Sequence, residues 1–77
     1  MGYTIKAEHI DYMLKGTALR RRRVVEAIAS DLRALGVKGR AEIKTVLFEQ
    51  LKAAGLPETT AGKYCRRIKS AVNYVNL

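Results

Sequence analysis

Apolar residues recur along the chain at steps of three and four, the spacing that keeps side chains on one face of an α-helix. The pattern occupies four stretches, and no segment alternates polar and apolar residues as a half-buried strand would. The positions that share a face are Ile5, His9, Tyr12 and Met13; then Val24, Val25, Ile28, Leu32 and Leu35; then Ile43, Val46, Leu47, Leu51 and Ala54; and finally Ala61, Tyr64, Cys65, Ile68, Val72 and Val75. The sequence therefore predicts an all-α fold, a compact four-helix domain over residues 1–77.

The helix boundaries follow from capping residues and glycines. Thr4 and Thr17 can accept hydrogen bonds from the free N–H groups that begin a helix. Gly36 and Gly55 stand where a left-handed residue commonly ends one. Pro57 suits a helix start, because the first turn leaves its N–H groups unpaired. We expect helices from Thr4 to about Lys15, from Thr17 to Leu35, between Gly39 and Gly55, and from Pro57 to about Val75.

The chain is strongly basic, and its charge is unevenly distributed. Fifteen Lys and Arg oppose seven Asp and Glu, so the formal net charge is 15 − 7 = +8 on 77 residues. Residues 12–25 hold five bases and no acid, residues 59–77 hold four bases and no acid, and the remaining six bases and seven acids sum to −1. A small protein with this excess is attracted to polyanions. The excess lies at the start of the second helix and along the fourth.

The arginine run at residues 20–23 cannot present a single face to a partner, since consecutive helical residues point about 100° apart. Arg21 shares the apolar arc of its helix, so its stem is expected on the core and its guanidinium in water. Arg22 and Arg23 are spaced for ion pairs with Glu26. Two interpretations stay open: a solvated basic turn, or a phosphate clamp supplied by two of the four arginines.

The fourth helix carries hydrogen-bond donors and no carboxylate on the face opposite its apolar stripe. On a helical wheel this line comprises Thr59, Lys63, Arg66, Ser70 and Asn73, with Arg67 and Lys69 on its flanks. Such a face suits a phosphate backbone and base edges, where acids would repel the phosphates. The alternative is an ordinary solvated face, although such faces usually mix both signs of charge.

The junction before this helix resembles a helix-turn-helix DNA-binding motif within residues 43–70. Its core is the segment EQLKAAGLPETTAGKYC, from Glu49 to Cys65. Gly55 suits the turn, Leu56 can pin the turn into the core, and an apolar pair three residues apart can dock the second helix. The resemblance implies a recognition helix from about Glu58 that turns the following residues toward the major groove: Glu58, Thr59, Gly62, Lys63 and Arg66.

Other chemistries find little support in the sequence. Cys65 is the single cysteine and His9 the single histidine, so neither a disulfide nor a usual four-ligand zinc site can form within one chain. We expect no catalytic, metal or cofactor site, and therefore no enzyme. A fold without disulfides suits a reducing compartment, so the expected location is the cytoplasm. No apolar stretch approaches the ~20 residues that cross a bilayer, and no membrane partner is expected.

These patterns predict a small protein that binds double-stranded DNA, a transcriptional regulator or accessory factor of the kind that phages and plasmids encode. Lys44 and Lys52 of the third helix are expected outside the interface, because that helix is near charge balance. The expected contacts are Thr59, Thr60, Lys63, Arg66, Arg67 and Ser70, with Arg20, Arg22 and Arg23. The candidate homodimer contacts are Tyr74, Val75 and Leu77, or Tyr3, Ile10 and Leu14.

Two alternatives to a DNA-binding function stay open. A compact basic bundle could be a non-enzymatic inhibitor or adaptor, for example phage-encoded, that docks on an acidic or nucleic-acid-binding protein surface. It could instead bind RNA by shape and phosphate contacts. A membrane-surface role is less suited, because the apolar face of the fourth helix carries small residues instead of Trp or Leu.

Overall fold

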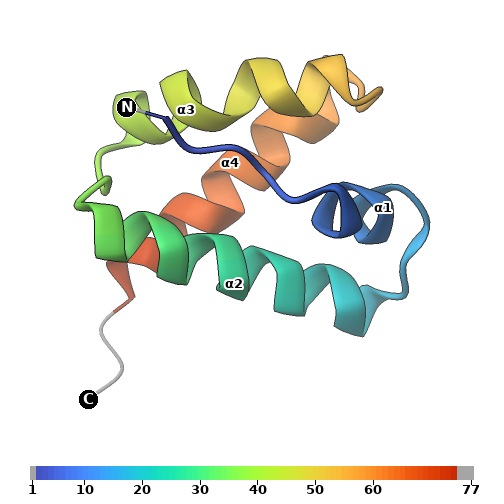
Figure 1. The fold of residues 1–77 in the computed structure, drawn as a ribbon, viewed down its shortest axis with the longest axis horizontal. Coiled ribbons are helices and arrows are strands. Elements are labelled where there is room, and N and C mark those ends of the chain that lie inside the picture. Colours follow the sequence, from blue (N-terminus) through green and yellow to red (C-terminus); the bar gives the residue numbers. More distant parts are fainter. Residues whose placement is uncertain (1, 75–77) are drawn as a thin grey trace.

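The computed structural model describes residues 2–74, which form four α-helices (Figure 1). They are α1 (Ala7–Lys15), α2 (Ala18–Leu35), α3 (Arg40–Ala53) and α4 (Glu58–Asn73). In the view of Figure 1, α4 lies behind α2 and α3 and packs against both, while α1 packs against α2. The described part of the chain contains no strand, so the predicted all-α four-helix domain is confirmed.

The predicted start is right for α2 and wrong for α1. The Oγ1 atom of Thr17 accepts a hydrogen bond of 3.2 Å from the N–H of Arg20, as expected of a cap. Thr4 caps no helix: α1 begins only at Ala7, because the preceding residues are held by α3 in a non-helical path. Val75, the expected end of the fourth helix, lies outside the described residues.

The C-terminal ends of α2 and α3 have the same backbone geometry. Gly36 (φ 80°) and Gly55 (φ 106°) adopt the left-handed conformation that side chains disfavour. The residues that follow them, Val37 and Leu56, donate their N–H groups to helix carbonyls five residues back, at 2.9 and 3.2 Å. Both are buried, so each turn is attached to the core where it leaves the helix. The predicted glycine stops are confirmed.

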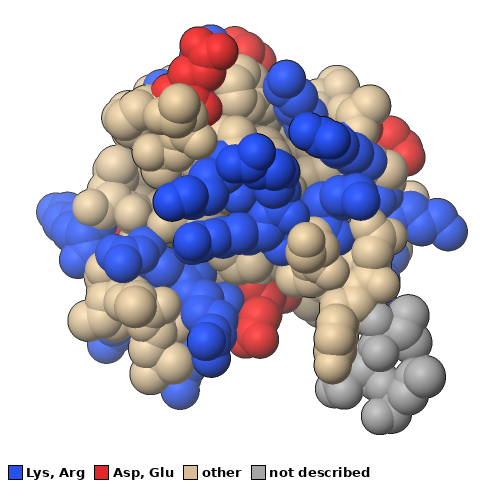
Figure 2. All heavy atoms as spheres, turned by 180° about the vertical axis from the view of Figure 1, so that it is seen from behind, with Lys and Arg blue, Asp and Glu red and all other residues tan. Residues whose placement is uncertain are grey.

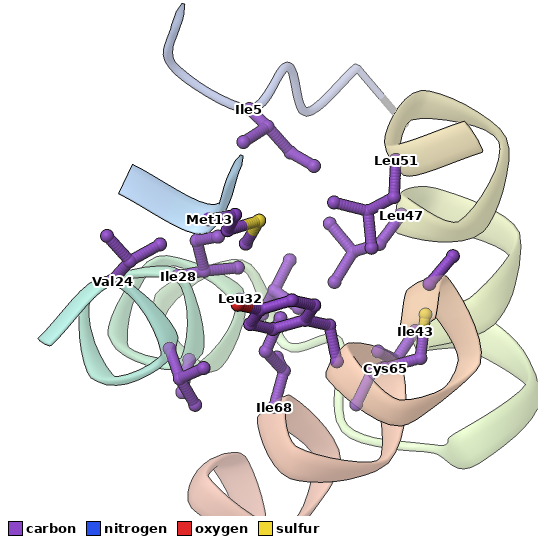
Figure 3. Close-up of a cluster of buried hydrophobic side chains, with 14 of the residues drawn as sticks. Ile5, Met13, Val24, Ile28, Leu32, Ile43, Leu47, Leu51, Cys65 and Ile68 are labelled. Carbon is purple, nitrogen blue, oxygen red and sulfur yellow. The ribbon is translucent and has the colours of Figure 1, made fainter. Parts of the chain in front are cut away.

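The core is a layer of aliphatic side chains between α2, α3 and α4 (Figure 3). Its fully buried members are Ile28 and Leu32 of α2, Ile43, Leu47 and Leu51 of α3, and Ala61 and Ile68 of α4. Ile5 and Met13 close the layer from the N-terminal segment and α1. Leu35 was predicted in the core but is 47% exposed, because α2 ends there and the turn carries Val37 inward instead.

The N-terminal segment, residues 2–6, forms a strap that crosses the near side of the molecule in Figure 1. The side-chain amide of Gln50 in α3 donates to the carbonyl oxygen of Tyr3 (2.8 Å) and accepts from the N–H of Ile5 (2.9 Å). The hydroxyl of Tyr3 donates to Asp31 of α2 (3.0 Å). Burial and this carboxylate raise the pKa of Tyr3, so the hydroxyl stays a donor. The strap therefore links α2 to α3.

The C-terminal end of α4 is tied to α2 and to the turn that follows it. The guanidinium of Arg33 donates to the carbonyls of Ala71 (2.7 Å) and Val72 (3.3 Å), groups that a helix end leaves without intrahelical partners. The amide of Asn73 donates to the carbonyl of Lys38 (3.2 Å). These bonds fix the direction in which α4 leaves the core.

Replacing Gln50 by alanine is expected to lower the free energy of unfolding by about 2 kcal/mol, because the part-buried N–H of Ile5 and carbonyl of Tyr3 lose their partner. Glu49→Ala is the neighbouring control, since this exposed residue makes only a 3.9 Å pair with Lys52, worth about 0.5 kcal/mol. Urea unfolding followed by circular dichroism measures both. Equal losses in the two variants would contradict the role of the strap.

Candidate nucleic-acid interface

The polar side of α4 faces outward on the side of the molecule away from the strap. Its orientation follows from the buried stripe of the same helix, which includes Ala61, Tyr64, Ile68 and Val72. Five of the predicted contacts on α4 are exposed, and the sixth, Thr60, is half-buried; the exposed ones are Thr59, Lys63, Arg66, Arg67 and Ser70. Figure 2 shows that Lys and Arg side chains form a band across this side, with acidic side chains at its margins.

The first two arginines of the run are engaged within the molecule. The guanidinium carbon of Arg20 lies 5.1 Å from the ring centroid of Tyr12, so this side chain turns toward α1. Arg21 donates from Nη1 to the carbonyl of Gly16 at 2.6 Å. Its guanidinium thus bonds to the chain between α1 and α2 instead of extending only into water, as expected from the helical wheel.

Arg22 and Arg23 are exposed on α2. Their predicted ion pairs with Glu26 are wrong: among residues 2–74 one ion pair is found, and it joins Lys52 to Glu49. An exposed arginine loses conformational entropy when it forms an ion pair, and the Coulomb energy gained in water is small. Their charges are therefore available to an outside anion.

The start of α2 and the middle of α4 meet at Tyr64. Burial raises the pKa of this hydroxyl, and the nearby guanidinium groups of Arg21 and Arg67 lower it by a smaller amount. Arg67 is thus brought close to the arginine run, although the two are more than forty residues apart in the sequence. Each of the two acid-free windows of the sequence thus contributes a guanidinium group near this hydroxyl.

A groove lies on the other flank of α4, between α3 and α4. It is lined by Arg40, Lys44 and Phe48 of α3 and by Glu58, Thr59, Gly62, Cys65 and Arg66 of α4. We call this the α3–α4 groove. Lys44 was expected outside the interface, yet it lines the same groove as Arg66, and Arg40 was not predicted at all.

A charge count over the whole of α3 hides these two residues. Arg40 and Lys44 are four residues apart, and therefore share a side of the helix. Glu42 and Glu49 cancel these two charges in a count, although both acids stand on the opposite side of the helical wheel. A charge count made separately for each side of the helix would have found this pair of bases.

Ser70 is separated from the rest of the predicted line. It lies in a second hollow, between α2 and the C-terminal part of α4, together with the carboxylate of Glu26 and the guanidinium of Arg33. The backbone carbonyls beside it accept hydrogen bonds from Arg33. The surface with unopposed positive charge therefore runs from Thr59 to Arg67 and ends before Ser70.

Cys65, Tyr3 and Ile10 have a structural role. Burial raises the pKa of Cys65, an effect that nearby Lys44 only partly offsets, so the thiol stays protonated and unreactive near neutral pH. The hydroxyl of Tyr3 is bonded within the strap, and Ile10 packs against the core. The other candidate dimer contacts in the described chain, Leu14 and Tyr74, are 48% and 69% exposed; Val75 and Leu77 lie outside the described residues.

Comparisons with protein-family models, with curated proteins and with solved structures found no match. Within residues 2–74, no cluster of three His, Cys, Asp or Glu side chains is placed to hold a metal ion. No helix in this range has the length and apolar character needed to span a membrane. The geometry and charge around α4 are therefore the basis for a functional proposal.

Gly62→Ala is expected to raise the free energy of unfolding by about 0.5–1 kcal/mol, because glycine weakens a helix interior and an added Cβ meets no atom within 4 Å. Gly36→Ala is the matched control: its Cβ also meets nothing, but the left-handed φ of 80° makes the same change destabilising by about 1–2 kcal/mol. Urea unfolding of both variants tests the pair. Destabilisation by Gly62→Ala would contradict the open space found around this residue.

Proposed function

We propose that the protein binds double-stranded DNA and acts as a regulator or accessory factor on it, with α4 in the major groove. The observation that carries this proposal is the acid-free exposed face of α4 from Thr59 to Arg67, set within a band of Lys and Arg (Figure 2). Lys63 and Arg66 can contact phosphates or guanine edges, and the Thr59 hydroxyl can donate to a phosphate. An anionic partner would also relieve the mutual repulsion of these cations.

The turn between α3 and α4 supports a helix-turn-helix role. Gly55 is left-handed and Leu56 is buried behind it, which brings the chain from α3 into α4 within four residues. Ala61 and Tyr64 of α4 are both buried, so the start of this helix is docked firmly on the core. A rigidly held helix can present its outer side chains in a constant register to base edges.

The dimensions and composition favour duplex DNA over other polyanions. With 16 residues, α4 is about 24 Å long, and a helix fits the ~12 Å width of the B-DNA major groove. The major groove of A-form RNA is too narrow for it. Single-strand binding needs exposed aromatic rings for stacking, whereas the chain has four Tyr and one Phe, of which Tyr64 is buried and Tyr3 is bonded to Asp31.

Lys63→Glu is expected to weaken binding to duplex DNA at least tenfold at about 100 mM salt, because a carboxylate would then face the phosphates. Lys6→Glu makes the same change in net charge at an exposed lysine of the strap, which lies on the side opposite α4 (Figure 1), and should change the affinity less than twofold. Fluorescence anisotropy with a labelled duplex, repeated over a range of salt, gives both values.

Equal effects of Lys63→Glu and Lys6→Glu would show that net charge alone attracts the DNA and would contradict a defined face. A structured RNA or an acidic protein that stayed bound at salt concentrations that release duplex DNA would favour the RNA or protein-binding alternative. Selection from random duplexes then tests whether the bound sequences share a site.

A further inference from the structure

Gly62 has no role in the fold that would account for a glycine in a helix. It lies in the second turn of α4, and positive φ angles occur only at Gly36 and Gly55 among the described residues. A Cβ at Gly62 would meet no atom within 4 Å, so no neighbouring element needs the space. Glycine weakens a helix relative to alanine, and a common reason to keep it is the close approach of another molecule to the backbone.

The groove over Gly62 carries more positive than negative side chains. Arg40, Lys44 and Arg66 line it against one carboxylate, that of Glu58. None of these cations takes part in an ion pair with the described residues, where the pair found is Lys52–Glu49. Three unneutralised cations around an open stretch of helix backbone are suited to an anion with several oxygens.

Phe48 orders one of these cations without neutralising it. The Nζ atom of Lys44 lies 5.0 Å from the centroid of the Phe48 ring, and the Nζ atom of Lys52 lies 5.2 Å from it. A cation held by a ring keeps its full charge and loses part of its freedom before a ligand arrives. The Lys44 ammonium on the α3 side of the groove is thus positioned before an anion binds.

We propose that the α3–α4 groove receives a phosphodiester segment of the DNA backbone, which lies against the bare backbone of Gly62 and is held by Arg40, Lys44 and Arg66. This inference rests on the proposed function. It adds a contact with the phosphate backbone on the second side of the major groove. The major groove lies between two phosphate backbones, so a helix inserted there needs cations on both flanks. The start of α2 supplies one flank, and the first two turns of α3 supply the other (Figures 1 and 2).

The first test fills the groove without changing its charge. Gly62→Gln places a neutral, helix-favouring side chain in open space, so the variant should fold and unfold at an equal or higher urea concentration. Its affinity for duplex DNA should fall at least tenfold, with Gly62→Ala between it and the unmodified protein. Ser30→Ala, an exposed helix position on α2, is the control and should change the affinity less than twofold.

The second test removes the α3 cations. The Arg40→Ala/Lys44→Ala double variant should reduce the slope of log affinity against log salt by about two, since each lost phosphate contact removes roughly 0.9 from it. Lys6→Glu lowers the net charge by the same two units from the strap and should leave the slope unchanged. Circular dichroism confirms that each variant is folded before the titrations are compared.

The outcomes separate this inference from the function on which it rests. If Gly62→Gln and the double variant bind duplex DNA as the unmodified protein does while Lys63→Glu is defective, the groove is no backbone site and the DNA-binding function stands. If the unmodified protein shows no salt-dependent binding to duplex DNA, both proposals fall. Loss of binding in both groove variants, with Lys6→Glu and Ser30→Ala unaffected, supports the contact.

Discussion

The burial of one stripe of α4 is the constraint on which the rest of the structure depends. Ala61 and Ile68 are fully buried, and both α2 and α3 pack against this helix. Because the stripe is narrow, the remaining circumference of α4 has to face outward, and that part carries bases and no acid beyond its first residue. The same packing that builds the core thus exposes a cationic face between two helices.

The face is electrostatically unfavourable for the isolated protein. Lys and Arg side chains gather on one side of the molecule with acids at its margins, and the one ion pair in the described chain, Lys52–Glu49, lies within α3. Gly62 adds a further loss of helix stability on the same surface. A bound polyanion would offset both the repulsion between these cations and the helix stability lost at Gly62, because binding stabilises the folded protein.

Two polar side chains join segments of the chain around α4 by hydrogen bonds. Gln50 binds the strap to α3 through the backbone of residues 3 and 5, and Arg33 binds the last carbonyls of α4. Each bond joins parts of the chain that are more than thirty residues apart. Neither residue belongs to an apolar stripe, so a periodic pattern cannot reveal its partner.

Local chemistry in the sequence was sufficient to determine the four helices, the Thr17 cap, the glycine ends and most of the core, because these depend on periodicity and on residues close in the chain. The predicted Thr4 cap and the burial of Leu35 were wrong, because a long-range strap and a turn decided those positions. Only the tertiary structure showed that Arg20 turns to α1, that Ser70 lies beside Glu26, and that Arg40 and Lys44 join Arg66 around Gly62. The physical reason is that a helical wheel gives the direction of a side chain from its own axis, whereas its neighbours depend on how the helices cross.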